Sequence, residues 1–249
     1  MNTPRKISNL TEYIDYINEL TETGGNYLYR GQENADWTVN SSAYRRVFKE
    51  QPDATSSFLA ESFVRYLIQI VNEVQLKYPT TYKGLSPLEC MAHLQHNKVA
   101  TGLIDFTYSP LVALWFACDD HVEKDGKVFV LENNTEKIEE ITKINILHQE
   151  LDVLFDMNQL RWHLWTPALD SKVVDTQRIT IQQSVFLFGL PEVTPEMNIQ
   201  EIVIPYQQKE LIRTELENIA ISEITLFPDL LGFFERNSHQ HPYDLSLNE

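Results

Sequence analysis

A polar segment that leads into an apolar helix concentrates the side chains best suited to chemistry. Residues 95–110 read QHNKVATGLIDFTYSP and supply an imidazole (His96), a carboxylate (Asp105) and two hydroxyls (Thr107 and Ser109). An imidazole titrates near neutral pH and is a common general acid or base, which a carboxylate can orient. We therefore take His96 and Asp105 as candidate catalytic residues and the two hydroxyls as candidate phosphate contacts. The alternatives are that Asp105 and the hydroxyls only satisfy backbone donors at a turn, and that His96 is a core histidine at the end of a helix with its hydrogen bonds satisfied.

The element that must position this segment is a helix that starts at Ser109–Pro110. Serine is a favoured N-cap, and proline suits the first turn because its missing N–H would have had no partner there. The free N–H groups and the dipole of a helix start favour negative charge, so an anion or phosphate site is expected there. The competing interpretation is a well-capped core helix with a polar lead-in. One buried face is predicted by apolar residues at i, i+3, i+4 and i+7, namely Leu111, Leu114, Trp115 and Cys118.

A second group of candidates lies on a predicted strand near the N-terminus, Tyr27–Arg30, which Gly31 and Gln32 follow. The planar guanidinium of Arg30 can grip a phosphate with two parallel hydrogen bonds. Gly31 permits a sharp turn or a close backbone approach. The alternative for Arg30 is a salt bridge to one of the many acids.

A third group is the pair Gln182–Gln183, within a predicted strand over 178–188. Their amides can read the edge of a base or of another amide. Because neighbouring strand residues face opposite sides, at most one of the two should reach a shared pocket. Among the aromatic residues, Tyr29 and Trp37 can stack on a base or belong to the core, and Trp115 is expected in the core.

Composition limits the classes of partner. The chain has 249 residues, 43% of them hydrophobic, and a formal net charge of -16. Such a charge repels extended nucleic acid, but a locally basic pocket can still admit a small nucleotide or an RNA end, and a protein partner remains open. Cys90 and Cys118 lie in apolar patterns that raise a thiol pKa, which disfavours a nucleophilic cysteine. The chain contains neither a P-loop nor G-x-G-x-x-G.

The cellular setting follows from segments that the sequence lacks. Residues 1–6 carry no apolar signal-peptide core, and no apolar run approaches the roughly 20 residues that cross a bilayer. We expect a cytoplasmic protein without a membrane partner. We also predict no metal site, because His239 and His241 in the tail have no cysteine or acidic ligand nearby.

Periodicity and turn signals predict an α+β (or mixed α/β) fold, a single domain over 1–249 with a small central sheet flanked by several helices. Its core spans about 27–234, with an N-terminal helix in 1–25 and a tail at 237–249. Ser8 should cap the first helix, and Ser86 and Glu89 should form a capping box at the start of the helix that follows them. Residues 51–57 should form a loop, 78–85 a connector and 161–175 an irregular loop, and short helical pieces should alternate with polar residues over 133–159. The expected helices are 10–20, 58–74, 87–96, 110–118, 207–219 and 229–236, and the expected strands are 27–30, 127–131, 178–188 and 202–204.

Four segments in this order resemble the FRG domain, a family named for its (F/Y)-R-G motif. They are Tyr29–Gln32 with Trp37; Gln95–Ala117; Arg178 with Gln182, Gln183 and Phe186; and Leu226–Leu230. The chain departs from the family where members commonly read Q-H-Y-G-L-P-T-R-L-L-D-W, because Gly102 stands in place of the arginine. Ser184 likewise replaces the glycine of the usual Q-Q-G. If that arginine contacts an anion in relatives, either Lys98 or Arg30 replaces it here or the activity is altered.

A more distant similarity, to the layout of ADP-ribosyltransferases, implies roles for these residues. It implies that Arg30 holds the phosphates of NAD, that a hydroxyl orders the pocket, and that Gln182 or Gln183 stands where a late acidic residue would stabilise a ribosyl cation. The resemblances together predict a pocket for a nucleotide-like ligand, with NAD as the candidate substrate and no certain cofactor. The protein would transfer or cleave a ribosyl linkage as an intracellular toxin or phage-defence effector.

The candidate residues and the alternatives follow from these resemblances. A non-catalytic binding module is the alternative, favoured by the missing late acidic residue. An acidic decoy of a basic nucleic-acid-binding protein is a further alternative, suggested by the net charge. The catalytic candidates are His96, Asp105 and Gln183, and the ligand-binding candidates are Tyr29, Arg30, Gly31, Gln32, Thr107, Ser109 and Gln182.

Overall fold

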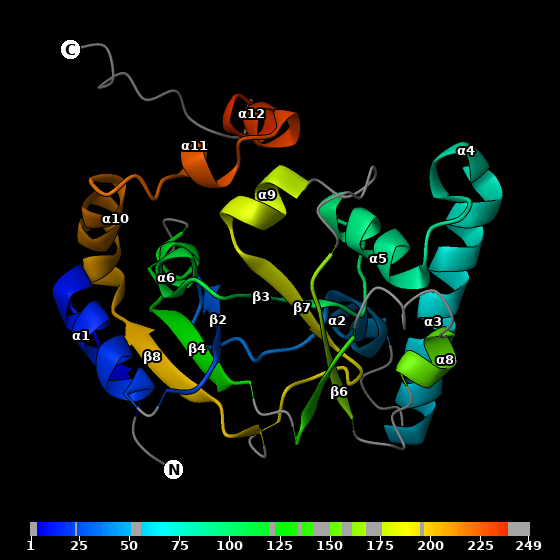
Figure 1. Ribbon diagram of the computed structural model, residues 1–249, viewed down its shortest axis with the longest axis horizontal. Helices are drawn as coiled ribbons and strands as arrows, with labels where there is room; N and C mark the ends of the chain where they lie inside the picture. Colours follow the sequence, from blue (N-terminus) through cyan, green and yellow to red (C-terminus); the bar gives the residue numbers. More distant parts are fainter. Residues whose placement is uncertain are drawn as a thin grey trace.

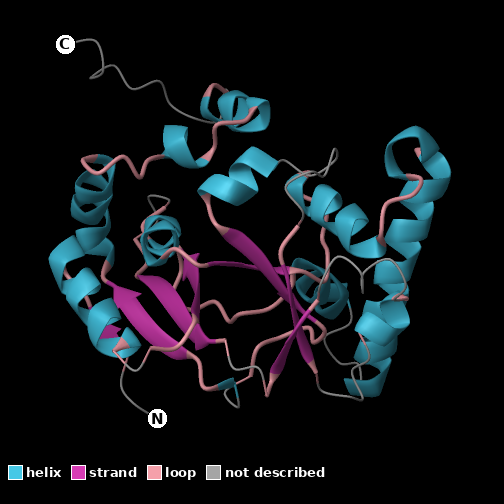
Figure 2. Ribbon diagram, viewed as in Figure 1, coloured by secondary structure: helices cyan, strands magenta, loops and turns pink. Residues whose placement is uncertain are grey.

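One mixed sheet runs through the centre of the molecule (Figure 2). The computed structural model describes residues 4–22, 24–50, 56–119, 123–133, 136–141, 150–155, 161–167, 176–194 and 197–238. In this part of the chain the sheet has eight strands in the order β1-β8-β4-β2-β3-β7-β6-β5. The pairs β1–β8 and β5–β6 are parallel, and the other neighbours are antiparallel. The strands are β1 (Arg5–Lys6), β2 (Tyr27–Gln32), β3 (Ile104–Thr107), β4 (Gly126–Glu132), β5 (Ile138–Glu140), β6 (Trp162–Trp165), β7 (Ser184–Phe188) and β8 (Gln200–Ile204). The predicted α+β single domain is confirmed.

The helices form two groups beside the sheet, and a third set lies along its upper edge in Figure 1. Helices α1 (Leu10–Thr21), α6 (Pro110–Ala117) and α10 (Lys209–Glu217) lie near β4 and β8. Helices α2 (Ser42–Glu50), α3 (Ser56–Lys77), α5 (Pro87–His96) and α8 (Leu151–Leu154) lie toward β6 and β7, and α4 (Pro79–Tyr82) follows α3. The upper set is α9 (Thr176–Ile181), α11 (Glu223–Leu226) and α12 (Leu230–Arg236). No helix in the described ranges is long and apolar enough to cross a membrane.

The two helix groups bury two separate apolar clusters. The α3–α5 cluster joins residues of α3, α5 and α8 to Phe186 and Phe188 of β7. The α1–α6–α10 cluster joins those helices to Val128 and Val130 of β4. A third cluster contains the intervening strand residues, such as Phe129 of β4. Because side chains alternate along a strand, the first two clusters lie on one face of the sheet and the third on the other. The helix-covered face is therefore divided between two packing units.

Local signals placed several helix ends as predicted. Ser86 and Glu89 form a capping box at the start of α5, with Pro87 in the first turn. Ser109 caps α6 by accepting a hydrogen bond from the N–H of Val112. The prediction for α1 was wrong by one residue, because Asn9 rather than Ser8 is the N-cap and its side chain accepts from the N–H of Glu12.

Two sequence-based assignments were wrong because distant contacts decided the conformation. The expected strand 178–188 is helix α9, then a turn with Gln183 at φ +48°, and only then β7. Part of the expected irregular loop 161–175 is β6, whose four residues are all buried. Strand β6 pairs with β5 on one side and with β7 on the other, which satisfies its backbone hydrogen bonds. Because its side chains are all buried, the sequence lacks the alternation of polar and apolar residues that marks a half-exposed strand. The predicted helical pieces over 133–159 contain β5 as well as α8.

Other expectations fall partly outside the described residues. The loop predicted over 51–57 includes 51–55, and the histidine pair of the tail, His239 and His241, also lies beyond the described ranges. The connector expected at 78–85 contains the short helix α4.

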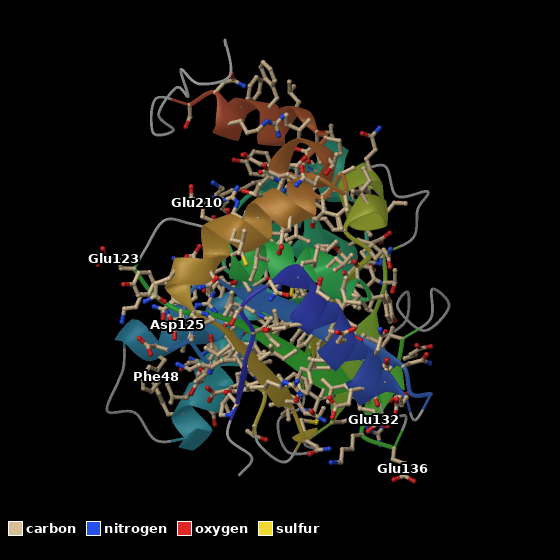
Figure 3. The ribbon with its side chains drawn as sticks, turned by 90° about the vertical axis from the view of Figure 1, so that its left-hand side faces the viewer. Phe48, Glu123, Asp125, Glu132, Glu136 and Glu210 are labelled. Atoms are coloured by element: carbon tan, nitrogen blue, oxygen red, sulfur yellow. The ribbon has the colours of Figure 1, made fainter. Side chains whose placement is uncertain are left out.

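Acidic side chains project from the outer surface of the molecule, where water solvates them. Figure 3 labels Glu123, Glu132, Glu136 and Glu210, all exposed, at the periphery of the view. The net charge of the chain is -16, so these carboxylates surround the molecule with negative potential. A cluster of cations elsewhere would stand out against this background.

Helix α6 packs directly against the backbone of β2 and β4, where each strand has a glycine at the contact. A Cβ atom on Gly31 would lie 1.9 Å from the carbonyl oxygen of Ala113 and 2.7 Å from the nitrogen of Ala117. A Cβ atom on Gly126 would lie 2.0 Å from the carbonyl oxygen of Ala117. No side chain fits at either position, which confirms the close backbone approach predicted for Gly31.

Replacing Gly31 with alanine should destabilise the fold, because the added methyl would have to push α6 away from β2. We expect Gly31→Ala to lower the free energy of unfolding by about 2–3 kcal/mol, measured by urea denaturation. Gly25→Ala is the matched control, since its nearest neighbours are atoms of the Tyr27 side chain, from 3.1 Å. Equal stability of the two variants would contradict the close contact.

Candidate functional site

The candidate site is a cavity of about 490 Å³ between the two helix groups, which we call the central cavity. Strand β2 supplies Tyr29, Arg30 and Gly31, and β3 supplies Asp105 and Thr107. Further lining residues come from α5 and the turn after it (Gln95, His96 and Lys98), from α6 (Phe116), from α9, the turn after it and β7 (Arg178, Gln182 and Phe186), and from the chain after α11 (Phe227). Segments far apart in the sequence therefore meet at one hollow.

Arg30 occupies an opening between two strands. Among the described residues β2 and β3 pair at one position, Tyr29 with Thr107. Beyond it, Nη1 of Arg30 donates a hydrogen bond of 2.6 Å to the carbonyl oxygen of Asp105 and lies 3.9 Å from its carboxylate. The Arg30 side chain is only 18% exposed. Burial lowers the pKa of Arg30, an effect that Asp105 opposes, and the guanidinium remains charged.

The guanidinium of Arg30 is not fully satisfied. Its Nε is buried and has no hydrogen-bond partner among the described residues. Because an unmade hydrogen bond from a buried donor is costly, such an arrangement is typical of a binding site rather than of packing. Arg30 is thus a fixed cation at the edge of the cavity.

Asp105 is held by the residue that precedes His96. Nε2 of Gln95 donates to Oδ1 of Asp105 at 2.7 Å, and the Thr101 hydroxyl donates to Oε1 of Gln95. The Asp105 side chain is 59% exposed, so its carboxylate faces solvent. The sequence predicts that Asp105 orients His96, and both residues line the central cavity.

His96 lies in the last turn of α5, half-buried, and lines the central cavity. His96 also lies close enough to Asp229 to lower the pKa of that carboxyl. His96 and Arg30 therefore line the same cavity.

Arg178 is oriented by a bidentate ion pair. Its Nε and Nη2 donate to the two carboxylate oxygens of Asp229 at 2.7 and 3.0 Å, and its guanidinium lies 4.6 Å from the centre of the Phe227 ring. Burial raises the pKa of Asp229, but the hydrogen bonds from Gly232 and Arg178 and the charges of Arg178 and His96 lower it overall. The C-terminal elements thus fix a second cation at the cavity.

The hydroxyls predicted to bind phosphate are engaged with the backbone. Thr107 lines the cavity, donates to the carbonyl of Gln182 at 2.6 Å, and accepts from the N–H of Ser109 at 2.9 Å. The Ser109 hydroxyl caps α6, and Ser109 is not among the residues that line the cavity. In this geometry both hydroxyls stabilise the turn before α6.

The three candidate glutamines have separate places. Gln182 lines the cavity, is buried, and donates through Nε2 to the carbonyl of Leu226 at 2.9 Å. Gln183 is exposed in the turn after α9, and it does not line the cavity. Gln32 is buried and lines a neighbouring cavity rather than this one. The expectation that at most one of Gln182 and Gln183 enters the pocket is confirmed, although a turn and not strand alternation separates them.

The position where the family commonly carries arginine has no room for one. A Cβ atom on Gly102 would lie 2.7 Å from Phe155 and 2.8 Å from Leu67, both in the α3–α5 cluster. The cavity instead contains the cations Arg30, Lys98 and Arg178. This composition fits the prediction that Lys98 or Arg30 replaces the missing arginine.

The cavity combines positive charge with apolar walls. Its lining residues include the cations Arg30, Lys98 and Arg178 and a single carboxylate, Asp105. The chain as a whole has a net charge of -16. Rings of Tyr29, Phe116, Phe186 and Phe227 complete the wall. Within the described ranges no group of three or more His, Cys, Asp or Glu side chains is placed to hold a metal ion. The arrangement can bind an anion joined to an apolar or aromatic group.

Both cysteines are buried, as their apolar surroundings predicted. Burial raises the pKa of Cys90 to about 11 and that of Cys118 to about 12. Neither thiol has the low pKa of a nucleophile.

Sequence reasoning did not select Arg178 or the aromatic residues Phe116 and Phe227 as site residues. Arg178 and Asp229 both lie in segments that resemble the FRG domain, and this was the sequence feature that could have indicated a common site. Phe116 is hidden in an apolar helix, where nothing local separates a cavity wall from the core.

The Arg178–Asp229 pair should make stability depend on pH. The pKa of Asp229 is lowered in the folded protein from an ordinary value of 3.8, so its stabilisation is complete above that value and is lost as pH falls through the folded pKa. We expect Asp229→Asn to lower the free energy of unfolding by about 2 kcal/mol at pH 7. The gap to the wild type should close in acid, measured by urea denaturation. The exposed Asp15→Asn is the control, and a gap independent of pH would contradict the pair.

A family model covers the part of the chain that supplies several of these residues. The family model described as the FRG domain matches residues 25–126, which include Arg30, Gly31, His96, Asp105 and Thr107. Arg178, Gln182 and Asp229 lie beyond the matched range. No curated protein and no solved structure matches the chain. The matched segment supplies β2, α5, β3 and α6 to the cavity, and over residues 25–126 the chain is similar to the FRG domain.

Proposed function

We propose that the central cavity binds a small phosphorylated ligand of nucleotide type. The observation that carries this proposal is the convergence of Arg30, Lys98 and Arg178 on one cavity in a strongly acidic chain. Clustered cations in a cleft with low-dielectric walls attract and retain anions. The aromatic wall then suits the remainder of such a ligand.

The three cations differ in how their side chains are held, and we expect them to contribute differently to binding. Arg30 and Arg178 are oriented by Asp105 and Asp229, so little side-chain entropy is lost when they bind an anion. A guanidinium offers paired donors to a phosphate. Lys98 lies just after α5 with φ at +62° and supplies a point charge at the rim.

NAD, ADP-ribose and the phosphate end of a short RNA are the ligands to test. Each combines phosphate with planar groups that can contact aromatic side chains. A protein partner that delivers or reads the ligand is compatible with binding in this cavity.

The direct test is isothermal titration calorimetry with NAD, ADP-ribose and a short RNA. We expect Arg30→Ala to weaken the ligand that binds by at least about tenfold, because a buried charge contact is lost. His96→Ala should also weaken it, since the imidazole lines the same cavity. Unchanged affinity in both folded variants would remove the cavity from the proposal.

Arg65→Ala is the matched control for the loss of one positive charge. Arg65 is exposed on α3, 4.0 Å from Glu61, and does not line the central cavity. Equal weakening by Arg65→Ala and Arg30→Ala would indicate a general charge effect instead of a site.

Ribosyl transfer or cleavage in the same cavity is the second candidate, and it would suit a toxin or phage-defence effector. The observation in its favour is that His96 and Asp105, which can transfer protons, line the cavity with Arg30. Against it, Gln182 stands near the expected position of the late carboxylate, and its amide is bonded to Leu226. We therefore favour binding without turnover.

Chromatography of nicotinamide after incubation with NAD separates the two candidates. We expect no release above the rate without protein, together with measurable binding of a phosphorylated ligand. Release that Asp105→Asn and His96→Ala both abolish, while the folded variants still bind, would overturn the non-catalytic proposal in favour of the second candidate.

A further inference from the structure

A second cavity adjoins the central one, and the two share Arg30, Gly31 and Phe116. This side cavity has a volume of about 670 Å³. By strand alternation Arg30 belongs with Phe129 on the opposite face from Tyr29, and β2 and β3 pair only at Tyr29–Thr107 among the described residues. The Arg30 guanidinium lies in the resulting opening, so a group bound to it can have neighbours in both cavities.

The side cavity has the opposite charge balance from the central one. Its carboxylates belong to Glu33, Asp36 and Asp119, and its cations are Arg30 and Arg45. Asp36 and Asp119 lie 2.9 Å from Lys124 and 3.2 Å from Arg213, respectively. An anion is therefore better placed on the central side of Arg30, and the side cavity suits a neutral group.

Trp37 provides an exposed aromatic surface in the side cavity. Its side chain is 48% exposed, whereas Trp115, Trp162 and Trp165 are buried. The loop that carries it is anchored, because the N–H of Ala35 donates to the carbonyl of Asp125 at 2.7 Å and Nζ of Lys209 donates to the carbonyl of Glu33 at 2.6 Å. A preorganised exposed indole is a stacking platform for a planar ring.

Gln32 supplies an unused hydrogen-bond acceptor in the wall of the same cavity. The residue is 6% exposed, and its Oε1 has no hydrogen-bond partner among the described residues. Its Nε2 donates to the carbonyl of Thr38 at 3.4 Å. Exchanging the amide O and N would bring two oxygens together, so the acceptor is the unpaired atom. A ligand N–H would satisfy it.

We propose that the side cavity is the base-binding half of the site and takes a nucleobase with an exocyclic amino group, whose phosphate lies at Arg30. This inference rests on the proposed function and adds the position and class of the base. Trp37 stacks on the base, and Oε1 of Gln32 accepts from its amino group. The same chemistry is offered by a free nucleotide and by the terminal nucleotide of an RNA.

Fluorescence quenching tests the stacking directly. Since Trp37 is the exposed one of the four tryptophans, acrylamide quenching should report mainly on Trp37. We expect ADP or a short oligoadenylate to protect this fluorescence, and pyrophosphate to bind without protecting it. The relative affinities of ADP and oligoadenylate identify the free nucleotide or the RNA end as the source.

Calorimetry with variants tests the same contacts. Trp37→Ala should weaken ADP about tenfold and leave pyrophosphate unchanged, while Trp37→Phe, which retains a ring, should recover most of the loss. Tyr78→Ala removes an exposed aromatic residue outside both cavities and should have no effect. Wild type should prefer ADP about tenfold over purine riboside 5′-diphosphate, which lacks the amino group, and Gln32→Met should abolish that preference.

Different binding results would contradict the base-binding role of the side cavity and the phosphate-binding role of the central cavity. If pyrophosphate and ADP bind equally well through Arg30, and neither Trp37 nor the amino group matters, the side cavity does not hold the base and the phosphate site survives. If no phosphorylated ligand binds the wild type, both proposals are wrong.

Discussion

The contact between the Arg30 guanidinium and the backbone carbonyl of Asp105 is the interaction on which the site depends. It joins β2 to β3 beyond Tyr29–Thr107, the position at which the described residues of the two strands pair. A charged side chain thus takes the place of a further backbone pair. The contact requires β2 to lie at a fixed depth below α6, which Gly31 sets by excluding any side chain between strand and helix. A buried cation with an unpaired N–H donor lowers the stability of a folded domain. An anion that accepts a hydrogen bond from this donor would offset that loss.

The division of the helix layer explains why a cavity exists at this position. The α3–α5 cluster and the α1–α6–α10 cluster each bury their own apolar residues against the sheet. Residues of both groups, such as Ala92 of α5 and Val112 of α6, line the central cavity between them. Close packing stabilises each unit separately, so the space between them is free to admit polar and charged side chains.

Elements beyond the matched FRG range complete the cavity wall. Helix α9 and the turn after it bring Arg178 and Gln182, and the segment after α11 brings Phe227 and Asp229. Gln182 links them to the centre, because its amide bonds to Leu226 while its carbonyl accepts from Thr107. The hydroxyl that we expected to contact a ligand thus joins the C-terminal elements to the strand that leads into α6.

The sequence alone determined features that depend on neighbouring residues. The capping box at Ser86–Glu89, the Ser109–Pro110 start of α6, the strand at Tyr27 and the close approach at Gly31 all follow from local conformational preferences, and the mixed α+β class follows from their order. Only the tertiary structure decided that Arg178 lies on a helix, that 162–165 is a strand and that Gln95 holds Asp105. These outcomes depend on hydrogen bonds and burial supplied by residues distant in the chain, whose free energies outweigh local propensity and leave no trace in the local sequence.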